Sequence, residues 1–472
     1  MFIKKLLVLS VLIGCKWGWA QNQTASALTE VADSLAVSKY AENEILNTEV
    51  LEPFFQKLND LKKNQSGKIN IVHIGDSHIQ ADLFTGKIRE RLQTEFGNGG
   101  LGFSFPYKLA KTNGNSFVQY SSNIEWNSYR NIYPLNGSLV GLSGIALAAK
   151  KDDFVIEITM RDARFQFTKM KIFTPGNENM FDVATASKTI MVEQKVPQKI
   201  NHRIKKGEAI GSIAKKYGVT LEQIKKANSL KGNLIQAGKV LYIPSNLIET
   251  KAIARSEFIP LETVAKKQYR EFINSEELSK IYLLPSKKAE TYNLNGLVFE
   301  NEQAGIIYHS IGVNGAKFSD YNKYKLFFEQ IKGLAPDLVV ISLGTNEAFD
   351  KMGTANYQEQ MNFFIDQIKK DNPRASILIT TPPPSLFQKK IPNSYSEGYA
   401  DSILEDAVAQ QYAVWDVFHI LGGINSVNEN YDKGLVSRDY VHYSKSGYEY
   451  KGELFANALL EAFKNFKISH KN

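Results

Sequence analysis

Three short segments, far apart in the chain, carry the residue types that ester hydrolysis needs. Gly75-Asp76-Ser77 offers a hydroxyl, Gly344-Thr345-Asn346 offers a side-chain amide, and Asp439 and His442 offer an acid and a base. Nucleophilic acyl transfer requires a hydroxyl, a base that takes its proton, an acid that orients the base, and donors for the oxyanion. Together these segments predict a serine esterase.

Ser77 lies between a predicted strand and a predicted helix. Residues 68–75 form an apolar run of strand length, and apolar residues then recur at helical spacing from Ile79 to Phe96. Ligands of open α/β sheets bind at the carboxyl ends of strands, and N–H groups at a helix start favour developing negative charge. A nucleophile is expected at this position. A plain turn is the alternative, because Gly, Asp and Ser are all common in turns.

The other two segments favour the catalytic interpretation. Asn346 follows the apolar run 336–343, where its side-chain amide could donate to an oxyanion. Asp439 and His442 are three residues apart, so Asp439 could hold the imidazole while His442 takes the proton of Ser77. A solvated surface pair is the alternative for these two residues. The coincidence of three segments argues against it.

With these segments, the chain resembles the SGNH (GDSL-type) hydrolase superfamily, whose blocks are Gly-Asp-Ser, a lone Gly, Gly-x-Asn and Asp-x-x-His, in this order. The second block is best matched by Gly315 in Ile311-Gly-Val-Asn-Gly315-Ala316, with Gly312 as the alternative. The resemblance implies a three-layer, flavodoxin-like parallel sheet. It also implies a set of roles: Ser77 as nucleophile and first backbone donor, Gly315 as second donor, Asn346 as side-chain donor, His442 as base and Asp439 as its partner.

The hydrolase blocks occupy residues 50–105 and 300–468, so the chain between them is an insertion. Within it, residues 199–245 resemble the LysM module, a βααβ unit that recognises glycans containing N-acetylglucosamine. The family's usual Gly-Asp-Thr after the first strand is Gly207-Glu208-Ala209 here. The resemblance implies a sugar groove bordered by Gly207, Glu208, Ala209, Asn233, Leu234 and Ile235.

The rest of the insertion, residues 106–198 and 246–299, alternates as strands do and predicts a β-sandwich interrupted by the LysM module. Bacterial peptidoglycan O-acetylesterases, which the chain resembles, carry a β domain of this kind within an SGNH fold. Ten Lys and Arg against two Glu give residues 199–245 a net charge of +8, equal to that of the whole chain. A solvated basic face is favoured over an anionic partner, and nucleic-acid binding is not expected.

The N-terminus predicts export. Lys4-Lys5 followed by the apolar residues 6–13 is typical of a signal peptide within residues 1–20, and 21–49 reads as a linker. Leu12-Ile13-Gly14-Cys15 resembles a bacterial lipobox, whereas cleavage after Ala20 would leave a protein without cysteine. Both routes remain open. The expected location is the periplasm or cell envelope, with membrane contact only through a lipid on Cys15.

The leading hypothesis is a peptidoglycan O-acetylesterase whose partner is peptidoglycan or a related glycan containing N-acetylglucosamine. The alternatives are an acetylesterase for another polysaccharide, a lipid esterase, and a non-catalytic wall-binding scaffold. No metal or cofactor is expected, because no cluster of His, Cys and carboxylates has ligand spacing. Strands should end near Gly75, Ile311, Leu343, Thr381 and Val417, and helices should span 79–96, 320–333, 354–371, 402–411 and 444–465.

Overall fold

The computed structural model describes residues 41–133, 139–193, 195–197, 200–244, 248–250, 252–287 and 289–469. The predicted signal peptide, the lipobox at Cys15 and most of the predicted linker lie outside these ranges. The chain divides into two compact units. One contains Leu51–Leu343 and Gln360–Ile377, and the other contains the described residues up to Val50, Gly344–Glu359 and the chain from Leu378 onward.

The first unit holds the strand that precedes Ser77. This strand, β2 (Lys68–Gly75), pairs in parallel with β20 (Gly305–Gly312) and with β21 (Leu338–Ser342). All eight residues of β20 are buried, as the near-continuous apolar sequence of a two-sided parallel strand requires. The helices of the hydrolase part of this unit are α2 (Glu52–Asn64), α3 (Ser77–Gln80), α4 (Leu83–Phe96), α7 (Phe318–Asn322) and α8 (Lys325–Ile331).

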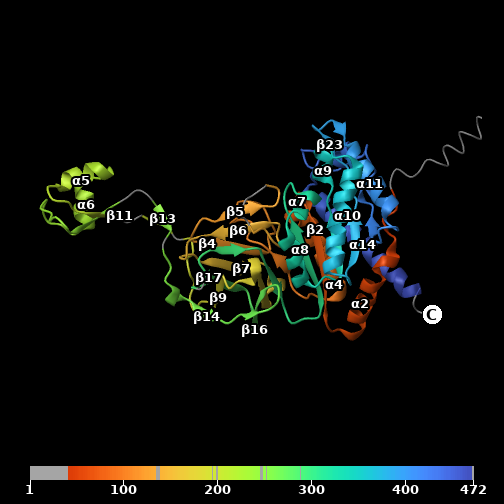
Figure 1. Cartoon of the computed structure of the whole chain (residues 1–472), viewed down its shortest axis with the longest axis horizontal. Coiled ribbons are helices and arrows are strands. Elements are labelled where there is room, and N and C mark those ends of the chain that lie inside the picture. The colour runs from red at the N-terminus through yellow and green to blue at the C-terminus, as the bar shows by residue number, and fades with distance from the viewer. Residues whose placement is uncertain are drawn as a thin grey trace, which may run out of the picture. The chain divides into compact units, whose positions relative to one another are not determined.

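The second unit continues the α/β alternation. In it β25 (Ala413–Trp415) runs parallel to β22 (Ser376–Thr380), which crosses the division between the units, and a short hairpin joins β23 (Leu386–Phe387) to β24 (Ile391–Pro392). The sheet order is β1-β25-β22-β21-β2-β20, so the predicted parallel sheet is present. The helices of this part are α9 (Thr345–Phe349), α11 (Ser394–Asp406), α12 (Val417–Ile420), α13 (Val427–Asp432) and α14 (Lys445–Ser469), with α10 (Thr354–Asp371) shared between the units. Figure 1 labels α9, α10, α11 and α14.

One edge of the sheet differs from the expectation. The predicted linker ended at residue 49, but β1 (Ile45–Leu46) pairs antiparallel with β25 and is followed by a 3₁₀ turn, Thr48–Leu51. Asn47 fixes this segment, because its side-chain amide donates to the carbonyls of Ala407 and Tyr412. A two-residue strand has no periodicity of its own, so the sequence could not show it.

Helix α10 has its predicted range, and α14 begins one residue later and ends four residues later than predicted. The three other predicted helices differ from the structure. The helix expected over 79–96 is broken at Asp82, whose φ of 58° lies in the left-handed region. The helix expected over 320–333 is broken at Tyr324, which is extended. The helix expected over 402–411 begins at Ser394, because the Asn393 side chain accepts the Tyr395 N–H and caps it, and it ends before Gln411, whose φ is 55°.

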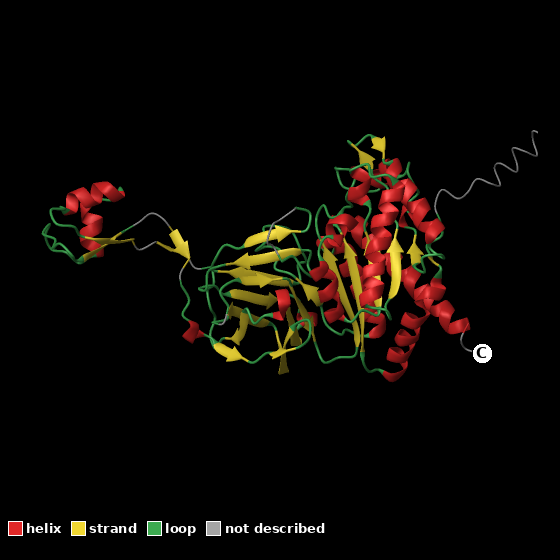
Figure 2. Cartoon of the chain, in the orientation of Figure 1, coloured by secondary structure: helices red, strands yellow, loops and turns green. Residues whose placement is uncertain are grey.

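The inserted region is antiparallel β structure, drawn as yellow arrows in Figure 2. One five-stranded sheet has the order β14 (Ile259–Leu261), β9 (Phe181–Thr185), β17 (Lys280–Pro285), β7 (Ile156–Met160), β4 (Val118–Ser122). A second has the order β15 (Val264–Ala265), β16 (Arg270–Leu278), β8 (Phe167–Phe173), β19 (Gly296–Glu300), β3 (Gly102–Ser104). A third, of three strands, is β18 (Tyr292–Leu294), β6 (Ile145–Ala149), β5 (Asn127–Arg130). Because β3 joins the second sheet, residues assigned to the hydrolase by sequence take part in the inserted domain.

The LysM region forms the predicted βααβ unit. Its strands β11 (Ile200–Arg203) and β12 (Val240–Ile243) pair antiparallel and enclose helices α5 (Ile210–Tyr217) and α6 (Leu221–Ala227). A separate apolar cluster forms its core, made of Ile204, Ile210, Ile213, Ala214, Ile224, Leu241 and Ile243. Backbone pairing of β10 (Lys195–Pro197) with β13 (Ile248–Thr250) brings the entering and leaving chain side by side.

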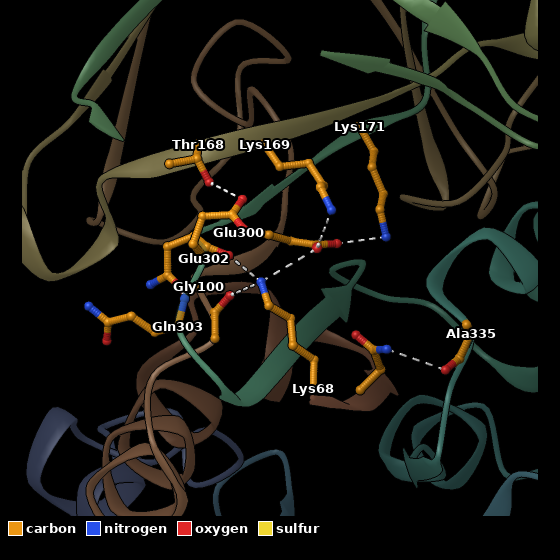
Figure 3. A network of polar contacts seen from close by, with 12 residues as sticks. Lys68, Gly100, Thr168, Lys169, Lys171, Glu300, Glu302, Gln303 and Ala335 are labelled. Atoms are coloured by element: carbon orange, nitrogen blue, oxygen red, sulfur yellow. Dashed lines mark hydrogen bonds and ion pairs between the residues drawn. The ribbon is translucent and has the colours of Figure 1, made fainter. Parts of the chain in front are cut away.

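A charged network links the inserted domain to the start of β2 (Figure 3). Glu300, at the end of β19, is surrounded by Lys171 at 2.6 Å, Lys68 at 3.8 Å and Lys169 at 4.0 Å. Burial lowers the pKa of Lys68, and the charge of Glu300 opposes that shift. Lys68 begins the strand that ends just before Ser77, so the network holds the inserted domain to the strand that carries the candidate nucleophile.

Candidate active site

Ser77 begins α3 at the carboxyl end of β2. The Asp76 side chain accepts the His78 N–H at 2.9 Å and thereby caps the short helix, while the Asp76 carbonyl accepts from Ile79 and Gln80. Every residue from 71 to 80 is buried except Ser77, which is partly exposed. The turn therefore buries its own backbone and leaves this one hydroxyl-bearing residue open to solvent.

The end of β20 packs directly against this turn. At Gly312 a side chain would not fit, because a Cβ there would lie 2.4 Å from the Gln80 nitrogen and 2.7 Å from the Asp76 carbonyl oxygen. The register agrees, since Gly312 pairs with Gly75 across the parallel ladder. The loop that follows β20 therefore starts beside the candidate nucleophile.

Residues 313–316, which follow Gly312, can be compared by the acceptor of each backbone N–H. Val313 donates to the Gly75 carbonyl at 3.3 Å, Asn314 to the Gln80 side-chain oxygen at 2.7 Å, and Ala316 to the Val313 carbonyl at 3.0 Å. Within this described loop, the Gly315 N–H alone has no protein acceptor, and Gly315 is exposed with a φ of +84°. This geometry favours Gly315 over Gly312 as a donor to a substrate.

Asn346 lies in the first turn of α9, directly after Gly344, whose φ is 129°. Its neighbours Thr345 and Glu347 are buried, while Asn346 is partly exposed. Asn346 is thus the partly exposed residue in the first turn of this short helix.

Asp439 and His442 form the contact that their spacing predicts. Asp439 Oδ2 lies 2.8 Å from His442 Nδ1, and Asp439 Oδ1 accepts the N–H groups of Val441 and His442 at 3.0 and 2.9 Å. Partial burial opposes ionisation of Asp439, but these three hydrogen bonds outweigh it and lower the pKa of the carboxyl. The carboxylate therefore orients the imidazole and stays charged at neutral pH.

A second Asp-x-x-His pair, not considered in the sequence analysis, follows β25. Asp416 Oδ2 lies 2.7 Å from His419 Nδ1, nearly the same geometry. However, Asp416 is buried and also accepts from the Thr381 hydroxyl at 3.0 Å, and Thr381 in turn accepts the Phe418 N–H at 2.9 Å. This network joins the ends of β22 and β25, so its first role is structural. The spacing of the motif would have been enough to find it.

Of the predicted glycan-binding residues, Leu234 is a large apolar residue that is 94% exposed. Glu208 replaces the residue usual at its position and has a clear local role, because its carboxylate accepts the Lys205 N–H at 2.7 Å and contacts His202 at 2.9 Å. These hydrogen bonds, first the one from the Lys205 backbone, lower the pKa of Glu208. The remaining residues of the predicted set lie in the same two loops: Gly207, Ala209, Asn233 and Ile235.

No group of three or more His, Cys, Asp or Glu among the described residues is arranged to hold a metal ion. None of the helices they form is both long and apolar enough for a membrane crossing.

Comparisons with known proteins agree with this architecture. Residues 293–450 match the GDSL-like Lipase/Acylhydrolase family, and residues 202–244 match the LysM domain. The chain thus contains a GDSL-like acylhydrolase domain and a LysM domain. The acylhydrolase domain makes it a carboxylic ester hydrolase by class. The solved structure of a peptidoglycan O-acetylesterase has the same fold, with a TM-score of 0.59 at 20% identity over 91% of this chain and 100% of that one.

A curated relative, the probable peptidoglycan endopeptidase LytE of Bacillus subtilis (strain 168), is 42% identical over 40 residues. These residues make up 8% of this chain and 12% of that protein, and the shared part is the LysM domain. The similarity therefore concerns the module and not the rest of either protein.

Proposed function

We propose that this protein is an exported peptidoglycan O-acetylesterase with a Ser77–His442–Asp439 triad. The support comes from the two domains together, because an acylhydrolase joined to a LysM module has its substrate and its binding partner on one polymer. The single observation that carries the chemistry is the Asp439–His442 contact of 2.8 Å, which orients the imidazole through Nδ1 and assigns the role of base to Nε2.

In the proposed reaction, Ser77 Oγ attacks the acetyl carbonyl carbon while His442 Nε2 takes the hydroxyl proton. The oxyanion accepts hydrogen bonds from the N–H groups of Ser77 and Gly315 and from the Asn346 side chain. His442 then returns the proton to the departing sugar oxygen, which leaves an acetyl-enzyme on Ser77. Water, deprotonated by His442, attacks this ester, and His442 then returns the proton to Ser77 Oγ as the ester bond breaks and acetate leaves.

The free Gly315 N–H supports the oxyanion assignment, because a solvent-facing backbone donor beside the nucleophile turn costs no protein hydrogen bond when substrate binds. The LysM module would hold the polymer through its exposed loops, with Leu234 as the side chain that gains most from contact with a sugar face. Export through the predicted signal peptide would bring both domains to the wall.

A second candidate is an acetylesterase for another polysaccharide or for lipid esters, which would use the same residues. A third is a wall-binding scaffold without turnover. The partly exposed Ser77 and the intact Asp439–His442 contact favour an enzyme over a scaffold.

The decisive experiment measures acetate released by the purified protein from O-acetylated murein, with de-O-acetylated murein as the blank and acetylated xylan and a lipid ester as competing substrates. We expect release from murein and its loss in Ser77→Ala. If acetate were released from acetylated xylan as fast as from murein, the second candidate, an acetylesterase for another polysaccharide, would be favoured. If the protein hydrolysed none of these esters, the wall-binding scaffold would be the remaining candidate.

A further inference from the structure

Gln80 connects the nucleophile helix to the loop that carries Gly315. It is the last residue of α3, three positions after Ser77, and its side chain is 2% exposed. Its Oε1 accepts the Asn314 N–H at 2.7 Å, and its Nε2 donates to the Asn113 carbonyl at 2.6 Å and to Thr112 Oγ1 at 2.9 Å. The side-chain amide therefore has partners on both of its atoms.

The three partners come from two chain segments that are far apart in the sequence. Asn314 directly precedes Gly315, and Thr112–Asn113 follows the first hydrolase segment, where the inserted domain begins. Asn314 Nδ2 also donates to Asn113 Oδ1 at 2.7 Å, so the two loops are joined to each other as well as to Gln80. Outside this cluster, the nearest atom to a Cβ built on Gly315 is Ile132 Cδ1, at 3.7 Å. Packing around Gly315 is thus sparse, and hydrogen bonds hold its loop.

The bond to Asn314 has a direct consequence for the oxyanion donor. A peptide plane is rigid, and the N–H of Gly315 belongs to the peptide that the Asn314 carbonyl begins. Fixing the Asn314 N–H leaves the φ and ψ of Asn314 as the two torsions that aim the Gly315 N–H. Glycine at a φ of +84° is otherwise free to adopt several conformations, so this loop needs an external constraint.

We infer that Gln80 is a positioning residue that aims the Gly315 N–H at the developing oxyanion; this inference rests on the proposed function. Gln80 touches no reacting atom. It joins the turn that holds Ser77 to the loop that holds Gly315, so that the nucleophile and this donor keep their relative position through the reaction. Preorganised donors act because they need no reorganisation when charge develops.

The test compares substitutions of Gln80 with a matched control. Gln330 is equally buried and also accepts a loop N–H, that of Leu142, at 2.7 Å, but it lies on α8 away from this cluster. Gln80→Met removes both hydrogen-bonding atoms, and Gln80→Glu keeps an oxygen for Asn314 while losing the donor to Thr112–Asn113. If Gln80→Met does not fold, Gln80→Asn, which is one methylene too short to reach Asn314, replaces it.

For a small acetyl ester we expect Gln80→Met to lower kcat by about 10- to 100-fold with little change in KM, a fraction of the full loss of one oxyanion donor. Gln80→Glu should recover most of kcat, and Gln330→Met should lower the melting temperature without lowering kcat. The rate at which a fluorophosphonate labels Ser77 should fall with kcat in Gln80→Met, because the phosphoryl oxygen occupies the same donors.

An unchanged kcat in folded Gln80→Met or Gln80→Asn, or a loss of kcat in Gln330→Met as large as theirs, would overturn the positioning role. The proposed function fails in a different experiment, namely when the unmodified chain releases no acetate or when Ser77→Ala keeps its activity. The two failures are therefore distinguishable.

Discussion

Replacing Asp439 with asparagine tests the orientation of the catalytic imidazole. Asp439 Oδ1 accepts two backbone N–H groups, so the asparagine oxygen should take that position and turn its NH₂ toward His442 Nδ1. Nδ1 must then accept, which moves the ring proton to Nε2. That is the nitrogen that should take the proton of Ser77, so most of the population would hold the wrong tautomer.

The size of the effect follows from exposure. The Asp439 and His442 side chains are 48% and 41% exposed, so their attraction lies between the values for bulk water and for a protein surface. That range is about 1–4 kcal/mol for charges 4 Å apart. With the tautomer cost added, Asp439→Asn should lower kcat by about 10²–10³-fold. A fully buried acid would give a larger loss.

The assay is steady-state hydrolysis of a small acetyl ester, with Asp416→Asn as the matched control. Asp416 has the same contact to a histidine, so its substitution changes the same chemistry at the other pair. We expect Asp416→Asn to lower the melting temperature and leave kcat near that of the unmodified protein. If Asp416→Asn lost the rate and Asp439→Asn kept it, the triad assignment would be refuted and the active pair would be Asp416–His419.

The remaining predictions concern the oxyanion, pH, the charged network and the module. Asn346→Ala should lower kcat by about 10²–10³-fold, measured on the same ester, and an unchanged rate would remove it from the site. Because the pKa of Asp439 is lowered, the stability it contributes is present above its unfolded pKa and is lost only as pH falls through the lower folded value; thermal melts of Asp439→Asn and the unmodified protein should therefore converge only at strongly acidic pH. Glu300→Ala should destabilise its unit by about 3 kcal/mol in denaturant unfolding, against less than about 1 for the exposed Glu461→Ala. Leu234→Ser should weaken murein pull-down without changing small-ester hydrolysis, and unchanged binding would exclude Leu234 from the glycan contact.

The parallel strands could be predicted from the sequence because consecutive residues of such a strand are buried on both faces and are therefore mostly apolar. In β2 and β20 nearly every residue is buried, so Ile, Val and Gly dominate both sequences despite a few polar residues, and the end of each run marks the site edge. The LysM unit was equally readable, since two short amphipathic helices between two strands repeat a known pattern. Local sequence was sufficient wherever local burial decided the structure.

The structural features that could not be predicted from the sequence depend on contacts with residues far away in the chain. The role of Gln80 arises from contacts with residues 33 and 234 positions away, and a lone glutamine after the nucleophile carries no signal for either. The helix break at Asp82 is of the same kind. Its carboxylate binds Arg89, seven residues further on, in a buried pair, and Arg89 in turn donates to the distant Tyr308 carbonyl at 3.1 Å. This buried network stabilises a left-handed residue where helical spacing predicted none.

The two Asp-x-x-His pairs show what a catalytic motif does and does not determine. In both, an aspartate accepts the backbone N–H of a histidine three residues further on and contacts its Nδ1, so the spacing alone produces the contact. What differs is the second set of partners. Asp416 also accepts the Thr381 hydroxyl at the strand ends, whereas Asp439 accepts the N–H groups of Val441 and His442 within its own loop. Because the local geometry is shared, the catalytic pair must be identified by what surrounds it, and the paired substitutions at 416 and 439 measure that difference directly.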